Sequence, residues 1–311
     1  MKNMTATAKG PGQALKTHSK VQFRETLVGY LFMLPLIVGL LVFTLYPMLD
    51  SFRLSLYGTY PQQPDTFIGL GNFDYAIRDP IFHKALGNTF IMAIYTMILV
   101  VPGSFILASL INSIPRGKNF YKILYYLPNV TSIVAIAILF RFVFYSSDQG
   151  IVNYVLSWFG IEPIPFFNHT GWSQFTVAFM SFWQALGSNM LICLAGLTGI
   201  SLVYYEAAEV DGANGFQKWL YITLPCSRPI IAYLVIMTTM GAMKRFGDVY
   251  MIGGQSGQPG GALRTVALYL YTTCFENFNP GYASAIAVIL FFIILILTVI
   301  NMKLVKFDND V

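Results

Sequence analysis

Residues 283–302 read ASAIAVILFFIILILTVINM, a run of 20 positions without a charged side chain. A helix of about 20 mostly apolar residues has the length that crosses the hydrocarbon core of a bilayer. The whole chain shares this character, because 56% of its 311 residues are hydrophobic and only 11% are charged. A soluble domain carries about 25% charged residues. The composition therefore excludes a cytosolic enzyme and indicates a membrane protein.

Six such apolar runs predict an all-α integral membrane protein with six transmembrane helices. A transmembrane β-barrel would instead show segments of about 10 residues with alternating polarity. We expect a basic cytoplasmic tail over residues 1–26, a six-span domain over 27–304 and a second cytoplasmic tail over 305–311. The predicted spans are 27–49, 86–112, 123–145, 173–200, 230–252 and 283–302.

The distribution of Lys and Arg among the short loops predicts the orientation of the chain. Twelve of them lie in the two tails and in the loops after spans two and four, against four in the remaining loops. Both termini are therefore expected in the cytoplasm, and the odd-numbered loops face outward. The four basic residues predicted to be external are Arg53, Arg78, Lys84 and Arg264.

Two of the outer segments have a recognisable local pattern. Residues 71–85 have the apolar spacing of an amphipathic helix, for which Asn72 is a candidate N-cap. The run 253–261, GGQSGQPGG, has the composition of a flexible loop.

The loop after span four, residues 201–229, reads SLVYYEAAEVDGANGFQKWLYITLPCSRP. Its composition predicts two short helices hinged at Gly212, because a sharp turn favours a residue without Cβ. A loop that lies on an anionic membrane surface would be rich in Lys and Arg. This one carries Glu206, Glu209 and Asp211 in its first half. We therefore expect a protein-docking surface, on which these carboxylates pair with a partner's arginines.

The segment resembles the EAA loop of ABC importer permeases, in which E-A-A, three residues, Gly, nine residues and I-x-L-P follow one another. The matching positions here are Glu206, Ala207, Ala208, Gly212, Ile222, Leu224 and Pro225. The stretches 69–90, 124–128 (LYYLP) and 150–153 (GIVN) also resemble the carbohydrate branch of these permeases, which includes the maltose and glycerol-phosphate importers.

The resemblance implies a MetI-like permease core in the cytoplasmic membrane of a bacterium. Its expected partners are a second homologous permease subunit, two cytoplasmic ATPase subunits and an extracytoplasmic solute-binding protein. The ATPase subunits would contact a cytoplasmic coupling loop over residues 203–229, at Glu206, Ala207, Ala208, Asp211, Gly212, Ala213, Ile222, Leu224 and Pro225. The substrate implied is a carbohydrate. Alternating access around a site near the bilayer midplane would carry it across.

The fifth predicted span departs from the carbohydrate branch, because it carries Lys244, Arg245 and Asp248. Charges inside a bilayer are costly and usually face the bundle interior or water. In one interpretation Asp248 neutralises one cation within the helix bundle. In the other, a cation lines the translocation path, and the substrate is an acidic oligosaccharide or a phosphorylated polyol such as a glycerol phosphate. The sequence leaves both open.

Uncharged side chains inside the spans supply further candidates for the substrate path. Gln184 and Asn189 either bridge helices or bind sugar hydroxyl groups, and Tyr250 either packs or stacks on a sugar ring. The predicted substrate path is therefore formed by Gln184, Asn189, Lys244, Arg245, Asp248 and Tyr250.

The remaining patterns exclude other classes of protein. The sequence lacks the G-x-x-x-x-G-K-[ST] phosphate loop, so we expect no enzyme, no cofactor of its own, and ATP and Mg²⁺ held by a partner. The positions of His and Cys predict no metal site, and the basic residues form no patch for nucleic acid. A membrane-embedded enzyme would need convergent ionisable groups. A channel or secondary transporter remains the alternative from another class, although neither needs a docking loop for an ATPase.

Overall fold

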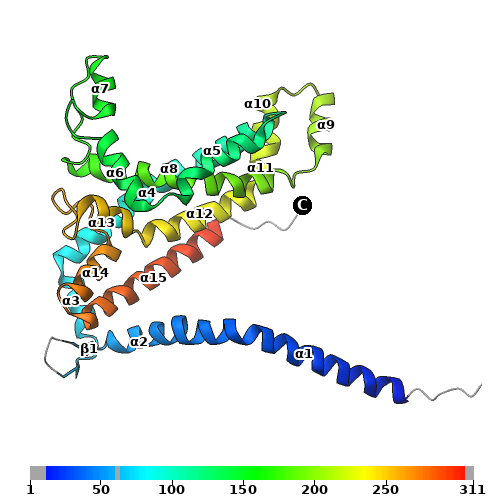
Figure 1. The fold of residues 1–311 in the computed structure, drawn as a ribbon, viewed down its shortest axis with the longest axis horizontal. Helices are drawn as coiled ribbons and strands as arrows, with labels where there is room; N and C mark the ends of the chain where they lie inside the picture. The colour runs from blue at the N-terminus through cyan, green and yellow to red at the C-terminus, as the bar shows by residue number, and fades with distance from the viewer. Residues whose placement is uncertain (1–11, 60–63, 305–311) are drawn as a thin grey trace, which may run out of the picture. The chain divides into compact units, whose positions relative to one another are not determined.

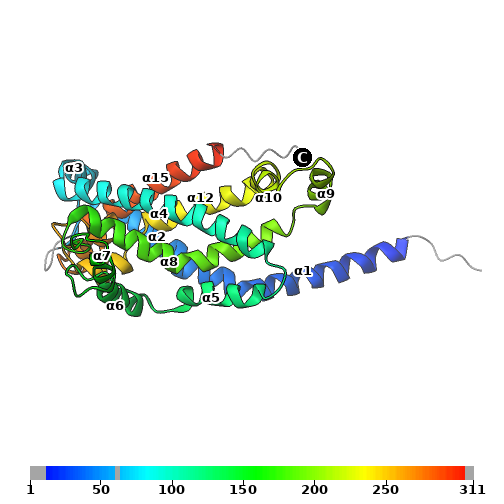
Figure 2. The same ribbon diagram turned by 90° about the horizontal axis from the view of Figure 1, so that it is seen from above.

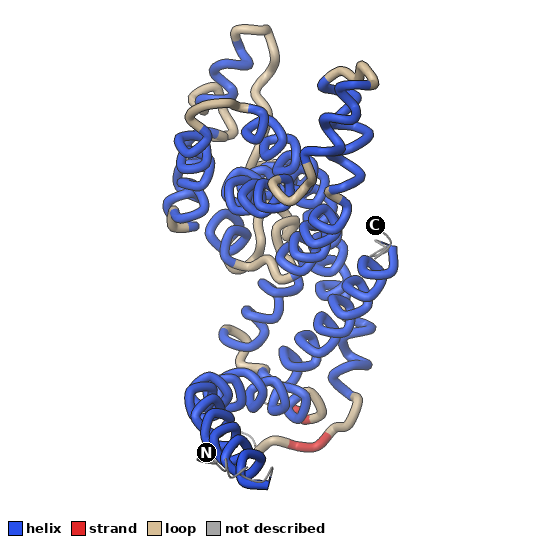
Figure 3. The backbone as a smooth tube through the Cα atoms, turned by 90° about the vertical axis from the view of Figure 1, so that its right-hand side faces the viewer, coloured by secondary structure: helices blue, strands red, loops and turns tan. Residues whose placement is uncertain are grey.

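The computed structural model describes residues 12–59 and 64–304. Within these ranges the regular structure is helical except for one antiparallel pair, β1 (Tyr57–Gly58) and β2 (Thr66–Phe67), in which Tyr57 lies opposite Phe67 (Figure 3). The chain divides into two compact units between Arg53 and Leu54. The first holds α1 (Gly12–Leu40), a π-helical segment (Leu41–Leu45) and α2 (Tyr46–Leu54).

The second unit contains the remaining helices. They are α3 (Gly71–Arg78), α4 (Pro80–Ser113), α5 (Lys118–Val130), α6 (Ile133–Val143), α7 (Ile151–Ser157), α8 (Thr170–Leu197), α9 (Leu202–Val210), α10 (Gly215–Lys218), a π-helical segment η2 (Trp219–Thr223), α11 (Leu224–Cys226), α12 (Arg228–Met243), α13 (Gly247–Gly253), α14 (Val266–Phe275) and α15 (Pro280–Leu304).

Helix α4 is the centre of the second unit. It packs against α8 and α12, and α12 packs in turn against α15 (Figures 1 and 2). Three clusters of buried apolar side chains form the core, and α4 contributes to each of them, for example through Ala85, Met92 and Phe105. Helices α3 and α14 lie at one end of this unit and α9 and α10 at the other (Figure 1).

Four helices are long and apolar enough to cross a membrane, namely Glu25–Leu54, Pro80–Ser113, Thr170–Leu197 and Pro280–Lys303. Two further pairs of helices bring the number to six if each bent pair counts as one span. The predicted all-helical membrane fold is confirmed, and four of the six predicted spans correspond to single long helices.

The expectation of one continuous span over residues 123–145 is wrong. Helices α5 and α6 meet at an angle of 98°, because the backbone is extended at Thr131 and Ser132. Pro128 has no N–H to donate to the preceding turn, which weakens the end of α5. On its other side α5 lies very close to α8, where a Cβ atom at Gly187 would stand 2.1 Å from the carbonyl oxygen of Tyr125.

The expectation of one continuous span over residues 230–252 is also wrong. Helix α12 ends at Met243, and the chain becomes helical again only at Gly247. The carbonyl oxygen of Arg245 accepts a hydrogen bond of 2.7 Å from the hydroxyl of Thr265 instead of continuing a helix. At its N-terminal end α12 is preceded by the helical stretch Gly215–Cys226, at an angle of 65°.

The segments predicted to be external also differ from their sequence-based description. The helix expected over 71–85 breaks at Asp79, because a residue before proline disfavours the α conformation. Asn72 does not cap α3, whose N-cap is Leu70. Instead, the buried side-chain amide of Asn72 donates to the carbonyl oxygens of Ser55 and Tyr57, both at 2.9 Å. The run 253–261 folds into hydrogen-bonded turns.

Candidate functional site

The loop 201–229 forms a helical hairpin at one end of the second unit (Figure 1). Helix α9 carries the E-A-A residues and ends at Val210. Gly212 follows with a φ of +77°, in the left-handed region that favours glycine at a helix C-terminus. Ala213 N–H donates to the carbonyl oxygen of Ala208 at 2.9 Å, which closes the turn. The predicted hinge at Gly212 is confirmed.

Side-chain contacts hold the two arms of this hairpin together. The Lys218 ammonium lies 2.7 Å from a carboxylate oxygen of Glu209, and this hydrogen bond keeps the pKa of Glu209 below its usual value. The hydroxyl groups of Tyr205 and Thr223 lie 3.0 Å apart. These two contacts therefore join the arms of the hairpin within the chain itself.

The second arm of the hairpin connects the loop to the core of the bundle. Trp219 packs on Phe105 of α4 with 6.0 Å between ring centroids. Leu224 joins the same apolar cluster, which also contains Leu234 of α12. A force applied to the hairpin would therefore reach both α4 and α12.

The residues predicted to contact ATPase subunits lie on both arms. Glu206, Ala207, Asp211 and Gly212 are exposed, and the others are half-buried, namely Ala208, Ala213, Ile222, Leu224 and Pro225. Exposed apolar side chains accompany them: Val210 is 88% and Phe216 is 69% exposed. A surface that combines small residues, carboxylates and exposed apolar side chains is suited to protein docking.

A second group of candidate residues meets at the break between α12 and α13. Arg245 Nη1 lies 2.9 Å from Asp248 Oδ2, and both residues are 7% exposed. The Ser181 hydroxyl on α8 accepts from Arg245 Nη1 at 2.8 Å and donates to Asp248 Oδ2 at 2.7 Å. Arg245 Nη2 donates to Thr96 Oγ1 on α4 at 2.6 Å. One ion pair thus joins three helices.

The structure does not bring the other path candidates into this cluster. Lys244 is exposed at the end of α12, and no ion pair joins it to a described residue. Tyr250 stacks on Phe246, 5.5 Å between centroids. The Gln184 amide lies 3.5 Å from the Thr131 carbonyl oxygen at the bend between α5 and α6. Asn189 donates to Ala185 of its own helix, 2.9 Å away.

Sequence reasoning missed the residues that complete the ion-pair cluster. Ser181 and Thr96 carry no motif, and only the packing of α8 and α4 around the helix break brings them to Arg245. Sequence reasoning also missed Asn88, which lies elsewhere on α4 and donates to the carbonyl oxygens of Gly261 and Arg264 at 2.8 and 3.0 Å. In residues 12–59 and 64–304, no group of three or more His, Cys, Asp or Glu side chains is placed to hold a metal ion.

The sequence of this chain matches a known protein family and several known relatives. Residues 100–306 match the family described as "Binding-protein-dependent transport system inner membrane component". The arabinooligosaccharides transport system permease protein AraP of Bacillus subtilis is 33% identical over 276 residues, which cover 88% of this chain and 87% of AraP. The lactose transport system permease protein LacF of Rhizobium radiobacter is 34% identical and covers 88% of this chain and 91% of LacF.

The solved structures include a similar chain. It belongs to a bacterial alginate ABC transporter in complex with alginate pentasaccharide-bound periplasmic protein. It has a TM-score of 0.79 and 23% sequence identity, and covers 92% of this chain and 97% of that chain. At this identity the likeness concerns the fold.

The fold is a bundle of apolar helices with two bent helix pairs and a helical hairpin at one end. This chain belongs to the family of binding-protein-dependent transport system inner membrane components, the permeases of ABC importers. The resemblance to ABC importer permeases of the carbohydrate type is thereby confirmed.

Proposed function

We propose that this chain is one of two permease subunits of an importer that carries an oligosaccharide across the cytoplasmic membrane of a bacterium. Similarity over most of their length to permeases named for arabinooligosaccharides and lactose supports the substrate class. A sugar-bound periplasmic protein accompanies the alginate transporter that shares the fold. This supports an external solute-binding protein as a partner here.

The observation that carries the coupling role is the helical hairpin between Leu202 and Cys226. Two cytoplasmic ATPase subunits would bind and hydrolyse ATP, and one of them would contact the exposed face at Glu206, Ala207 and Asp211. The positive φ of Gly212 fixes the angle between the arms. The contact between Trp219 and Phe105 supports transmission of ATPase closure to α4.

The candidate residues of the substrate path fall into two groups in this proposal: a buried ion pair that positions helices, and side chains that could contact the substrate. Arg245 and Asp248 neutralise each other and hold α13 against α8, so we assign them a positioning role. Lys244 keeps an exposed ammonium group, and Tyr250, Gln184 and Asn189 offer an aromatic face and amides. An exposed cation at the end of α12 supports an oligosaccharide with an acidic sugar, with Lys244 as its ligand.

The test is ATPase stimulation of the reconstituted complex with its binding protein. Neutral oligosaccharides, uronate-bearing oligosaccharides and phosphorylated polyols would be compared. We expect stimulation by uronate-bearing compounds, with loss in Lys244→Gln and retention in Lys244→Arg. Stimulation by neutral sugars alone would remove Lys244 from the site and keep the oligosaccharide class. Response only to phosphorylated polyols would overturn that class. Substrate flux without any ATPase would favour a channel or secondary transporter.

A further inference from the structure

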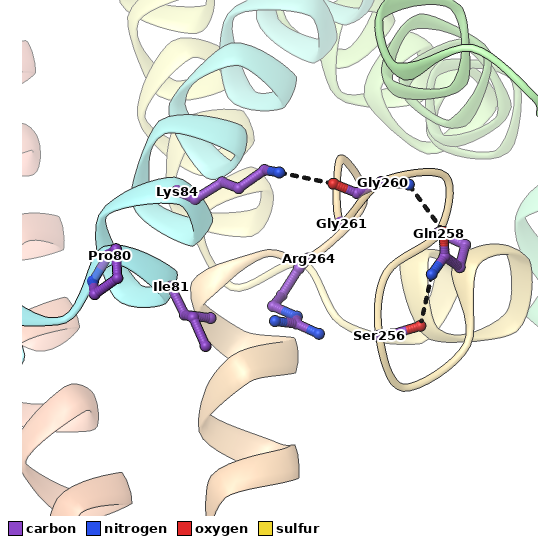
Figure 4. Close-up of a pocket in the computed structure, with 8 residues that line it drawn as sticks. All are labelled: Pro80, Ile81, Lys84, Ser256, Gln258, Gly260, Gly261 and Arg264. Carbon is purple, nitrogen blue, oxygen red and sulfur yellow. Dashed lines mark hydrogen bonds between the residues drawn. The ribbon is translucent and has the colours of Figure 1, made fainter.

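A pocket at the end of the second unit at which α4 begins carries two cations without a carboxylate among its lining residues. It has a volume of about 390 Å³ and lies between the first turn of α4 and the turns that precede α14. Lys84 and Arg264 supply the charges, and Pro80 and Ile81 form an apolar wall. Figure 4 shows the Arg264 guanidinium directed into the space between Ile81 and Ser256.

The guanidinium of Arg264 is short of acceptors. Its Nε is buried and has no hydrogen-bond partner among the described residues. A buried donor without an acceptor costs free energy that a suitable ligand can recover. Asp79 precedes the α4 residues of the pocket, but its carboxylate already accepts hydrogen bonds from the hydroxyl groups of Tyr269 and Tyr282.

The walls of the pocket are fixed by hydrogen bonds from neighbouring helices. Lys84 donates to the carbonyl oxygen of Gly260 at 2.7 Å. The Asn88 amide holds the carbonyl oxygens of Gly261 and Arg264, and Gln174 of α8 donates to Asn88 Oδ1 at 3.0 Å. The Lys84 ammonium and the backbone that carries Arg264 are thus held in place before any ligand arrives, which lowers the cost of binding.

An exposed apolar stripe continues from the pocket along α4. Ile91, Ile94 and Ile98 are 41%, 48% and 61% exposed and lie on the same helical face as Lys84. Ten residues of helix from Lys84 to Ile94 cover about 15 Å. This equals half of a hydrocarbon core of about 30 Å, which is the depth of one leaflet.

We propose that this pocket binds the phosphate headgroup of an anionic phospholipid from the outer leaflet, with an acyl chain along the isoleucine stripe of α4. A phosphate matches the guanidinium fork of Arg264 in two parallel hydrogen bonds, and the ammonium of Lys84 supplies the second charge. Pro80 and Ile81 lie at the first turn of a helix long and apolar enough to cross a membrane. In this proposal that turn lies where headgroups meet hydrocarbon. The apolar stripe favours a lipid over a free anion.

The experiment measures lipid binding to the purified permease complex by native mass spectrometry. Phosphatidylglycerol, phosphatidylcholine and inorganic phosphate are titrated separately in detergent. We expect one saturable phosphatidylglycerol site, at least about tenfold weaker in Arg264→Gln because charge-assisted hydrogen bonds are lost. Arg264→Lys should retain part of the affinity, and Lys84→Gln should lose part of it.

Arg78→Gln is the matched control, because it removes one positive charge from an exposed ion pair on the neighbouring helix α3. It should leave phosphatidylglycerol binding unchanged. Equal binding in the wild type and Arg264→Gln would overturn the proposal. Equal affinities for phosphatidylcholine and phosphatidylglycerol would also overturn it. So would displacement of phosphatidylglycerol by inorganic phosphate that binds with the same affinity as the lipid. If Arg264→Gln fails to assemble, unchanged binding in Lys84→Gln would decide against the proposal.

Discussion

Arg245 and Asp248 form an ion pair across the break between α12 and α13, with 2.9 Å between Arg245 Nη1 and Asp248 Oδ2. Both side chains lie in an apolar environment, where an isolated charge is costly. The hydroxyl of Ser181 contacts both partners of the pair. The three side chains therefore satisfy one another at the break, while the backbone carbonyl oxygen of Arg245 accepts a hydrogen bond from Thr265.

Removing one partner of this pair should damage the protein more than removing both. Asp248→Asn leaves Arg245 as an uncompensated buried cation, so we expect a loss of about 3–5 kcal/mol in the free energy of unfolding. The double variant Arg245→Met with Asp248→Leu should lose less. Thermal unfolding of the detergent-purified complex measures both. Lys244→Met is the control, because the side chain of Lys244 is exposed. Equal stability of Asp248→Asn and wild type would contradict a structural role for the pair.

Gly187→Ala should push α5 away from α8. A Cβ atom at this position would lie 2.1 Å from the carbonyl oxygen of Tyr125, far inside van der Waals contact. We expect a loss of about 1–3 kcal/mol, the usual cost of overpacking, visible as a lower thermal unfolding temperature. Gly87→Ala on α4 is the matched control, since a Cβ there meets nothing within 4 Å. It should be neutral or stabilising by up to about 1 kcal/mol. If both variants behave alike, the close approach of the two helices is not tight in solution.

Gly212→Val tests the angle of the docking hairpin. A β-branched residue at a φ of +77° is strained by at least about 1–2 kcal/mol. The hairpin should then change its angle, and binding-protein-stimulated ATPase activity should fall several-fold while the spans remain folded. Gly215→Ala is the control, because Gly215 lies at the start of α10 in ordinary helical backbone with open space around it. Wild-type levels of binding-protein-stimulated ATPase activity in Gly212→Val would show that the turn at Gly212 is not needed for coupling.

Asp79 should make the end of the bundle at which α4 begins sensitive to acid. Burial raises the pKa of its carboxyl, but hydrogen bonds from Tyr269, Tyr282 and Ile81 N–H outweigh this and keep the pKa below its usual value. A lowered pKa in the folded state stabilises the protein above the unfolded-state pKa, and this contribution is lost as the pH falls through the folded value. We expect Asp79→Asn to cost about 1–3 kcal/mol at pH 7.

The pH dependence separates this carboxylate from a neutral hydrogen-bond acceptor. The difference in unfolding temperature between wild type and Asp79→Asn should shrink below about pH 4, near the unfolded-state pKa of an aspartate. Asp74→Asn, in the exposed pair with Arg78, should change little at either pH. A difference that stays constant from pH 7 to pH 3 would show that the charge of Asp79 does not contribute.

Local patterns predicted the features that depend on few residues. The run 283–302 has the length and composition of a membrane helix whatever surrounds it, and α15 covers it in the structure. The hinge at Gly212 follows from the conformational freedom of one residue, and its φ is +77°. Breaks inside apolar runs could not be predicted in this way. Nothing in the periodicity of residues 230–252 marks position 244, and the break depends on Thr265 and Ser181, which are distant in sequence.

The sequence by itself determined that this chain is a helical membrane protein and to which family of permeases it is related. These properties follow from hydropathy and from fixed spacing of motif residues, which act locally along the chain. Only the tertiary structure decided that Arg245 is neutralised by Asp248 whereas Lys244 remains exposed, and that Arg264 faces a pocket beside Lys84. Both results depend on which helix packs beside which, because a buried charge is stabilised by the groups that surround it in space.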